Sequence, residues 1–152
     1  MSWVMMALNT ELDTNEISVY ETKLVKLSSD KVYFHSVQSN KLSDISAKYD
    51  TENELVEAKF EGELKNLDAS SEEYLETKQE ELKEKQKLSN EQADETQKVQ
   101  EETSKKEGEF DMLQESYQTR LEVLREDRRS AKETRDKCIS EECSYFSSSG
   151  GQ

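Results

Sequence analysis

The residue types that usually carry catalysis are few and scattered in this sequence. The only histidine is His35, and no cysteine or carboxylate motif accompanies it, so a catalytic triad would need unmarked partners from elsewhere. Cys138 and Cys143, with one remote histidine, do not supply the roughly four convergent ligands that zinc requires. Neither Gly62 nor Gly108 belongs to a phosphate-binding loop. We therefore expect no catalytic residue, metal, cofactor or small-molecule substrate, and we predict that the protein is not an enzyme.

A basic cluster is the other group of residues that could carry chemistry. All five arginines lie between positions 120 and 135. Helical spacing places four cations in one row that could bind phosphate, namely Arg125, Arg128, Arg129 and Lys132. Acidic residues interleave with this row at spacings suited to ion pairs across one helical turn, so we interpret it as a salt-bridged exposed face. Arg128 and Arg135 fall in the predicted seam between helices, where we expect them to pair with acidic residues of the N-terminal half and set the register.

The composition favours long helices over a compact globular domain. Only 32% of the residues are hydrophobic and 37% are charged, so the chain cannot build a thick apolar core. It has no proline and only four glycines, and the good helix formers Glu, Lys, Gln and Leu fill its middle. We predict an all-α fold, specifically an elongated coiled coil.

The charge and hydropathy of the chain limit its partners. Its formal net charge of −14 repels nucleic acid and anionic lipid. No segment approaches the roughly 20 apolar residues of a membrane-spanning helix, and the apolar run at 3–8 is too short for a signal-peptide core. We expect a cytoplasmic protein with no nucleic-acid partner and no membrane insertion. Export by a route that needs no cleaved signal stays open.

Apolar residues recur at helical spacing along much of the chain. Beyond position 34 the repeat lengthens to eleven residues, which corresponds to about 3.67 residues per turn. We expect this stripe to contact another chain in a homo-oligomer, through Leu42, Ile45, Tyr49, Val56, Phe60, Leu64 and Leu67. Residues 76–109 are almost wholly polar and should be exposed. Residues 110–146 return to a heptad repeat formed by Phe110, Tyr117, Leu124, Ala131, Cys138 and Tyr145.

A lapse in the stripe divides the chain into two arms. We predict a first helical arm at 1–67, a turn at 68–71, a second arm at 72–146 and a disordered tail at 147–152. Ser70 and Glu73 fit a capping box, in which each side chain satisfies a free backbone N–H at a helix start. The sequence thus favours an antiparallel helical hairpin.

The hairpin has consequences for which residues meet. It pairs residues whose numbers add up to about 140, so that Ile17 meets Leu124 and Leu64 meets Leu75. The middle of the stripe would then face the polar residues 91–98, which predicts that a second copy of the chain covers it. A single long helix in a parallel coiled-coil dimer is the alternative architecture.

The function that fits these features is binding to other protein chains. We predict a non-enzymatic coiled-coil protein that acts as a rod-like scaffold, spacer or tether. Strong interfaces centre on aromatic and aliphatic anchors, and these concentrate near the two termini, at Trp3, Met5, Met6, Leu8, Ile139, Tyr145 and Phe146. The alternative is a hairpin adaptor or chaperone-like component of a protein export apparatus, since small stalk proteins of flagellar and type III secretion systems are also long helical hairpins. That resemblance is one of architecture, without a shared motif.

Overall fold

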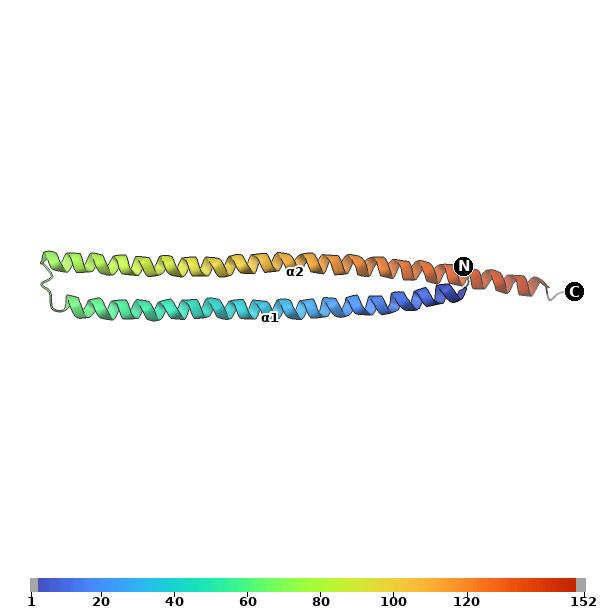
Figure 1. The fold of residues 1–152 in the computed structure, drawn as a ribbon, viewed down its shortest axis with the longest axis horizontal. Helices are drawn as coiled ribbons and strands as arrows, with labels where there is room; N and C mark the ends of the chain where they lie inside the picture. Colours follow the sequence, from blue (N-terminus) through green and yellow to red (C-terminus); the bar gives the residue numbers. More distant parts are fainter. Residues whose placement is uncertain (1–2, 150–152) are drawn as a thin grey trace. The chain divides into compact units, whose positions relative to one another are not determined.

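Two helices make up the described part of the chain. The computed structural model describes residues 3–149, and it describes side-chain surroundings for residues 9–144. Helix α1 runs from Trp3 to Leu64 and helix α2 from Glu72 to Ser149 (Figure 1). The described residues contain no strand. The predicted all-α fold class is therefore confirmed.

The sequence explains why both helices run for so many turns. Proline is absent, and no described residue has a positive φ, so nothing locally interrupts either helix. Threonines, which are poor helix formers, donate their hydroxyl protons to the carbonyl four residues earlier, as Thr22, Thr77 and Thr103 do. These bonds satisfy the hydroxyl groups without breaking the backbone hydrogen bonds of the helix.

The connection between the helices differs in detail from the predicted turn. Helix α1 ends at Leu64, three residues before the predicted limit, and α2 begins at Glu72 as expected. The Asn66 side chain donates to the carbonyl of Gly62, which lacks a partner in the helix. The connection therefore occupies 65–71 rather than 68–71.

The start of α2 is capped by Ser71 and not by the predicted capping box at Ser70. The Ser71 hydroxyl accepts a hydrogen bond from the backbone N–H of Tyr74 at 3.2 Å, the usual geometry of an N-cap serine. Ser70 instead donates its backbone N–H and its hydroxyl to the carboxylate of Asp68. These two bonds, the backbone one first, lower the pKa of Asp68.

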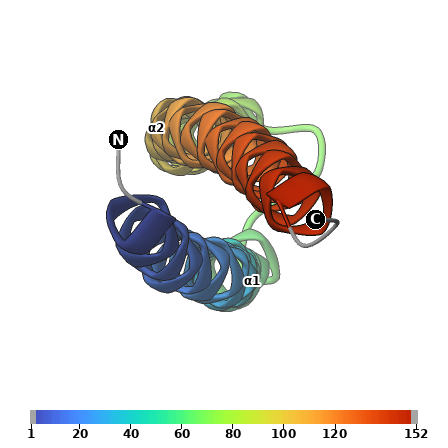
Figure 2. The same ribbon diagram turned by 90° about the vertical axis from the view of Figure 1, so that its right-hand side faces the viewer.

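The chain divides into two compact units, which we describe separately. Unit 1 comprises residues 1–31 and 108–152, and unit 2 comprises residues 32–107. Within each unit a segment of α1 packs antiparallel to a segment of α2, as Figures 1 and 2 show. Unit 2 contains the connection and is a helical hairpin. Cross-helix pairs between residues as far apart in sequence as Glu16 and Arg120 exclude the alternative of one unbroken helix.

Unit 1 has an apolar core. Ile17, Leu121 and Leu124 form a buried cluster, and Tyr20 and Leu24 pack against it. The predicted meeting of Ile17 with Leu124 is confirmed. The ring of Tyr20 also contacts the ring of Tyr117 edge-on, with centroids 5.9 Å apart. Leu27 and Phe110 are also buried in this unit.

Unit 2 buries a mixture of aromatic and polar side chains. Tyr49 and Phe60 are each only 2% exposed, and Gln38 and Glu81 are buried with them. The polar segment of α2 therefore covers the middle of the α1 stripe within one chain. This corrects the expectation that Tyr49 and Phe60 need a second copy to cover them. The other five stripe residues are half-buried.

Two further expectations are wrong in the described structure. Leu75 is 60% exposed, and the half-buried residue beside it is Tyr74, so Leu75 does not pack on Leu64. Residues 147–149, predicted as disordered tail, continue α2. Serine lowers helix propensity only slightly, and the residues before it already form the helix.

Candidate functional site

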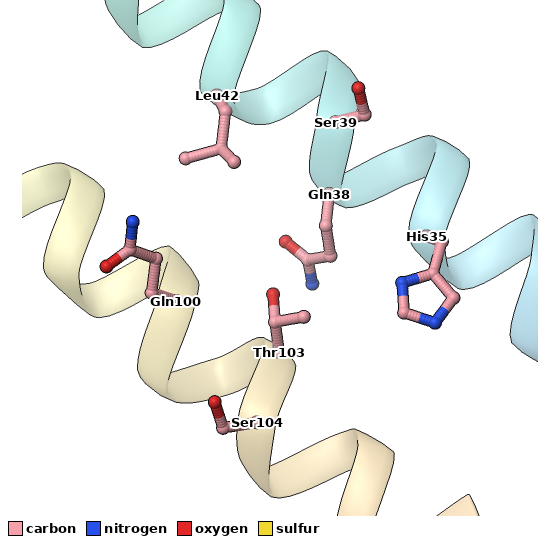
Figure 3. Close-up of a pocket in the computed structure, with 7 residues that line it drawn as sticks. All are labelled: His35, Gln38, Ser39, Leu42, Gln100, Thr103 and Ser104. Atoms are coloured by element: carbon pink, nitrogen blue, oxygen red, sulfur yellow. The ribbon is translucent and has the colours of Figure 1, made fainter.

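The most polar stretch of the seam in unit 2 forms an open groove. Its volume is about 470 Å³, and α1 and α2 both line it, with His35, Gln38, Ser39, Leu42, Gln100, Thr103 and Ser104 (Figure 3). Gln38 and Thr103 point toward each other across the seam, whereas Leu42 lies one turn away beside Gln100. Amide, hydroxyl and imidazole groups therefore replace the apolar side chains that usually fill a helix–helix seam.

Gln38 is the most deeply buried polar residue of the groove. It is 3% exposed and lies near the carboxylate of Glu102, to which Lys41 donates a hydrogen bond at 3.0 Å. Lys41 first and Gln38 second lower the pKa of Glu102. The Oε1 atom of Gln38 has no partner among the described residues. A buried acceptor without a donor is costly, so this atom marks a point where the seam is not optimised for stability.

His35 lies at the rim of the groove and contacts a carboxylate of the other helix. Its Nε2 atom is 3.5 Å from the Glu107 carboxylate, and both side chains are about two-fifths exposed. The ring of Phe34 contacts it edge-on. A histidine paired with an exposed carboxylate across two helices can bridge them electrostatically when it is protonated.

Lysine–carboxylate pairs join the two helices on the outside of the seam. In unit 2 they are Lys41–Glu102, Lys48–Glu95, Lys59–Glu84 and Lys85–Glu57. Lys31–Asp111 forms the same kind of pair in unit 1. Exposed ion pairs add little to stability, so this set matters more for the register and direction of helix pairing than for stability.

The pair at Lys48 extends into the buried seam. Glu95 accepts a hydrogen bond from Lys48 at 2.8 Å and another from the Tyr49 hydroxyl at 3.1 Å. Those two bonds, in that order, lower the pKa of Glu95. Burial raises the pKa of Tyr49, and the hydrogen bond that Lys48 donates to Glu95 raises the pKa of Lys48. Glu95, which lies in the stretch 76–109 that was predicted to be exposed, thus covers the buried side chain of Tyr49.

Glu81 places a carboxylate in the seam near the connection. Lys78 and Lys85 contact its two oxygens at 2.6 and 3.0 Å, and Lys85 also reaches Glu57 of α1 at 2.8 Å. The bonds from Lys78 and then Lys85 lower the pKa of Glu81. Two cations therefore neutralise this buried charge, and one of them ties α2 to α1.

The arginines pair differently from the prediction. Arg120 and Arg125 reach across unit 1 to Glu16 and Glu21, at 3.3 and 2.9 Å. Arg135 bonds its own neighbour Asp136, and Arg128 forms no pair with a described acidic residue. The expectation that Arg128 and Arg135 set the register is wrong, because the arginines that reach carboxylates of α1 are Arg120 and Arg125.

The predicted partner-binding residues fall mostly outside the described side chains. This holds for six of the seven: Trp3, Met5, Met6, Leu8, Tyr145 and Phe146. The side chain of Ile139 is described and is 46% exposed.

Cys138 is half-buried and Cys143 is exposed, and both are free thiols. Within residues 3–149 no three His, Cys, Asp or Glu side chains converge as metal ligands would.

The spacing of residues in the sequence could have predicted the burial of Gln38, although its polar side chain suggests exposure. Leu27, Gln38, Tyr49 and Phe60 are each eleven residues apart, and all four are buried. The same spacing in α2 links the half-buried Leu88 and Val99 to the buried Phe110 and Leu121. The burial of Glu81 could not have been predicted in this way, because nothing in the sequence distinguishes it from the other acidic residues, of which the chain has 35 in all.

Comparisons with known proteins returned nothing: no family model, no curated protein and no solved structure matches the chain. Among the described residues, neither helix has a stretch apolar enough to cross a bilayer.

Proposed function

We propose that this chain is a non-enzymatic interaction protein that acts as a scaffold, spacer or tether and associates with other protein chains. The observation that carries the proposal is the use of polar side chains in unit 2. Lysines and carboxylates of the two helices pair across the seam, and even the buried Glu81 belongs to such a bridge. This arrangement fixes the register of a long helical pair, which is what a spacer or scaffold requires.

The partner-binding surface in this proposal lies at the ends of the chain in unit 1. Both terminal segments belong to this unit, and they carry the apolar cluster from Trp3 to Leu8 and the residues Ile139, Tyr145 and Phe146. Tryptophan, tyrosine and methionine are enriched in the cores of protein interfaces. The exposure of Ile139 supports a role in contacts outside its own unit.

The oligomeric mass of the full chain tests the proposal. One chain has a mass of 17.6 kDa, and we expect light scattering at micromolar concentration to give a multiple of it. Deletion of residues 1–8, or Ile139→Glu, should reduce the mass to that of one chain and leave the helical circular dichroism signal unchanged. Leu82→Glu, at an exposed leucine of unit 2, is the matched control. A monomer at all concentrations would reject homo-oligomerisation, and loss of helicity in both terminal variants would assign those residues to folding.

A further inference from the structure

The basic row of α2 forms a groove in unit 1 that leaves two of its cations unpaired. Arg125, Arg128, Arg129 and Lys132 line it together with Ile17 and Glu21 of α1, and its volume is about 410 Å³. Arg125 binds Glu21, and Arg129 lies 3.3 Å from Glu126 and 3.9 Å from Glu133. Arg128 and Lys132 form no ion pair or hydrogen bond with any described residue.

The use of arginine distinguishes this row from the rest of the chain. Every arginine lies within 120–135, and all other cations of the chain are lysines. Lysine suffices for the cross-helix pairs of unit 2. Arginine offers a planar set of donors that binds a carboxylate or phosphate through two parallel hydrogen bonds.

The geometry points to an anion-binding site, and we propose that the basic row docks an acidic helix of a partner protein. Arg128 and Arg129 each lie three or four residues from Arg125 and from Lys132, so the row extends for about 10 Å, or two helical turns. Carboxylates on one face of a helix have the same spacing. Arg125 already pairs with the carboxylate of Glu21, which also lines the groove, so this arginine is placed to bind a carboxylate.

The charges around the row favour a narrow ligand. Glu21 forms part of the groove wall, and Glu122, Glu126, Asp127, Glu133 and Asp136 flank the row along α2. A duplex nucleic acid, which carries phosphates all around its surface, would meet these carboxylates as well as the cations. A helix with glutamates on one face only would present its charges to the row alone.

Binding of a defined peptide to the full chain tests the inference. The probe is a labelled alanine-rich helical peptide with three glutamates at positions i, i+4 and i+7, and its counterpart has glutamines there. We expect the glutamate peptide to bind, and the double variant Arg128→Gln with Lys132→Gln to weaken it about tenfold, the size expected for two exposed ion pairs. Because neither side chain has a partner in the fold, the melting temperature should stay unchanged.

The control removes the same charge elsewhere. Lys98→Gln with Lys105→Gln alters two exposed lysines of unit 2 and should leave peptide affinity unchanged. Equal weakening by both double variants would mean that only net charge matters and would overturn the site. Equal binding of the glutamine peptide, or tighter binding of inorganic pyrophosphate or a short DNA duplex, would overturn the assignment to an acidic helix. The inference rests on the proposed function only in taking the partner to be a protein, and the terminal deletion tests that function separately.

Discussion

Burial in this molecule follows position along the helix more closely than it follows side-chain polarity. The eleven-residue row of Leu27, Gln38, Tyr49 and Phe60 is buried throughout, although one of its members is an amide. Exposed apolar side chains such as Leu55 lie on other faces of the same helix. A polar residue in the seam lowers stability while it restricts the registers in which the helices can pair, as buried amides do in paired helices.

The packing of Phe60, the last member of this row, can be tested by truncating its side chain. Phe60→Ala should lower the free energy of unfolding by about 3 kcal/mol, because it removes a ring that is 2% exposed. Leu55→Ala, one and a half turns away at a side chain that is 66% exposed, should change it by no more than about 0.5 kcal/mol. Urea unfolding followed by circular dichroism measures both. Equal losses at the two sites would show that Phe60 is not packed against α2.

The contact of Glu95 with Lys48 and Tyr49 predicts that the stability of the fold depends on pH. A carboxylate whose pKa is lower in the folded than in the unfolded chain stabilises the fold above its ordinary pKa, which is 4.5 here. That stabilisation disappears as the pH falls through the lowered pKa of Glu95 in the folded chain. The melting temperature of Glu95→Gln should therefore lie below that of the natural chain at pH 7, and the difference should shrink below pH 4.5.

A comparison of two glutamates separates this contact from the effect of net charge. Glu91→Gln removes the same charge at an exposed residue that pairs only weakly, at 3.7 Å, with Lys87 of its own helix. Its melting temperature relative to the natural chain should depend much less on pH. If both variants gave the same pH profile, the bonds from Lys48 and Tyr49 would contribute nothing beyond charge.

At the scale of the elements, the connection shows how far local sequence determines a helix boundary. The lapse of the apolar stripe located the start of α2 correctly at Glu72, and the cluster of serine and acidic residues indicated a cap. Two adjacent serines compete for the cap position, however. Asp68 decides between them, because its carboxylate binds Ser70 and leaves Ser71 to cap the helix.

The cap can be tested with three serine substitutions. Ser71→Ala should lower the free energy of unfolding by about 1 kcal/mol, because it leaves the N–H of Tyr74 without its side-chain acceptor. Ser89→Ala, at an exposed position inside α2, should be neutral or slightly stabilising, since alanine is the better helix former. Thermal unfolding measures the difference. A larger loss for Ser70→Ala than for Ser71→Ala would favour the capping box over the observed cap.

The elements were more predictable from the sequence than the contacts between them. Absent proline, repeated leucines and the break near 68 suffice to predict two helices and antiparallel pairing. Whether Tyr49 faces a second chain or α2 depends on how well polar residues cover it, and Glu95 does so through one hydrogen bond that no periodicity reveals. The partners of Arg128 and Arg135 were mispredicted for the same reason, because ion pairs depend on side-chain reach as well as on seam position.

At the scale of the whole molecule, the two units are stabilised in different ways. Unit 1 buries the apolar cluster of Ile17, Leu121 and Leu124. Unit 2 buries Gln38 and Glu81 beside its aromatic side chains and has four cross-helix lysine–carboxylate pairs. The described residues of unit 1 form three cross-helix ion pairs beside its apolar cluster, so polar contacts make up the larger share of the seam in unit 2. Salt screens exposed ion pairs but does not weaken apolar contacts. The local stability of the two units should therefore change differently with ionic strength, although both units contain segments of α1 and α2.

Hydrogen exchange of the full chain at low and high salt tests this difference. On raising sodium chloride from about 0.05 M to about 1 M, where the screening length falls to about 3 Å, backbone exchange in unit 2 should accelerate relative to exchange in unit 1. The segments to compare are 41–60 with 84–102 in unit 2 and 17–27 with 117–124 in unit 1. The ratio between units matters, because screening of the net charge of −14 reduces repulsion throughout the chain and shifts both together. A parallel change in all four segments would show that the ion pairs of unit 2 do not contribute to its local stability, and that its register depends on the Tyr49 and Phe60 contacts instead.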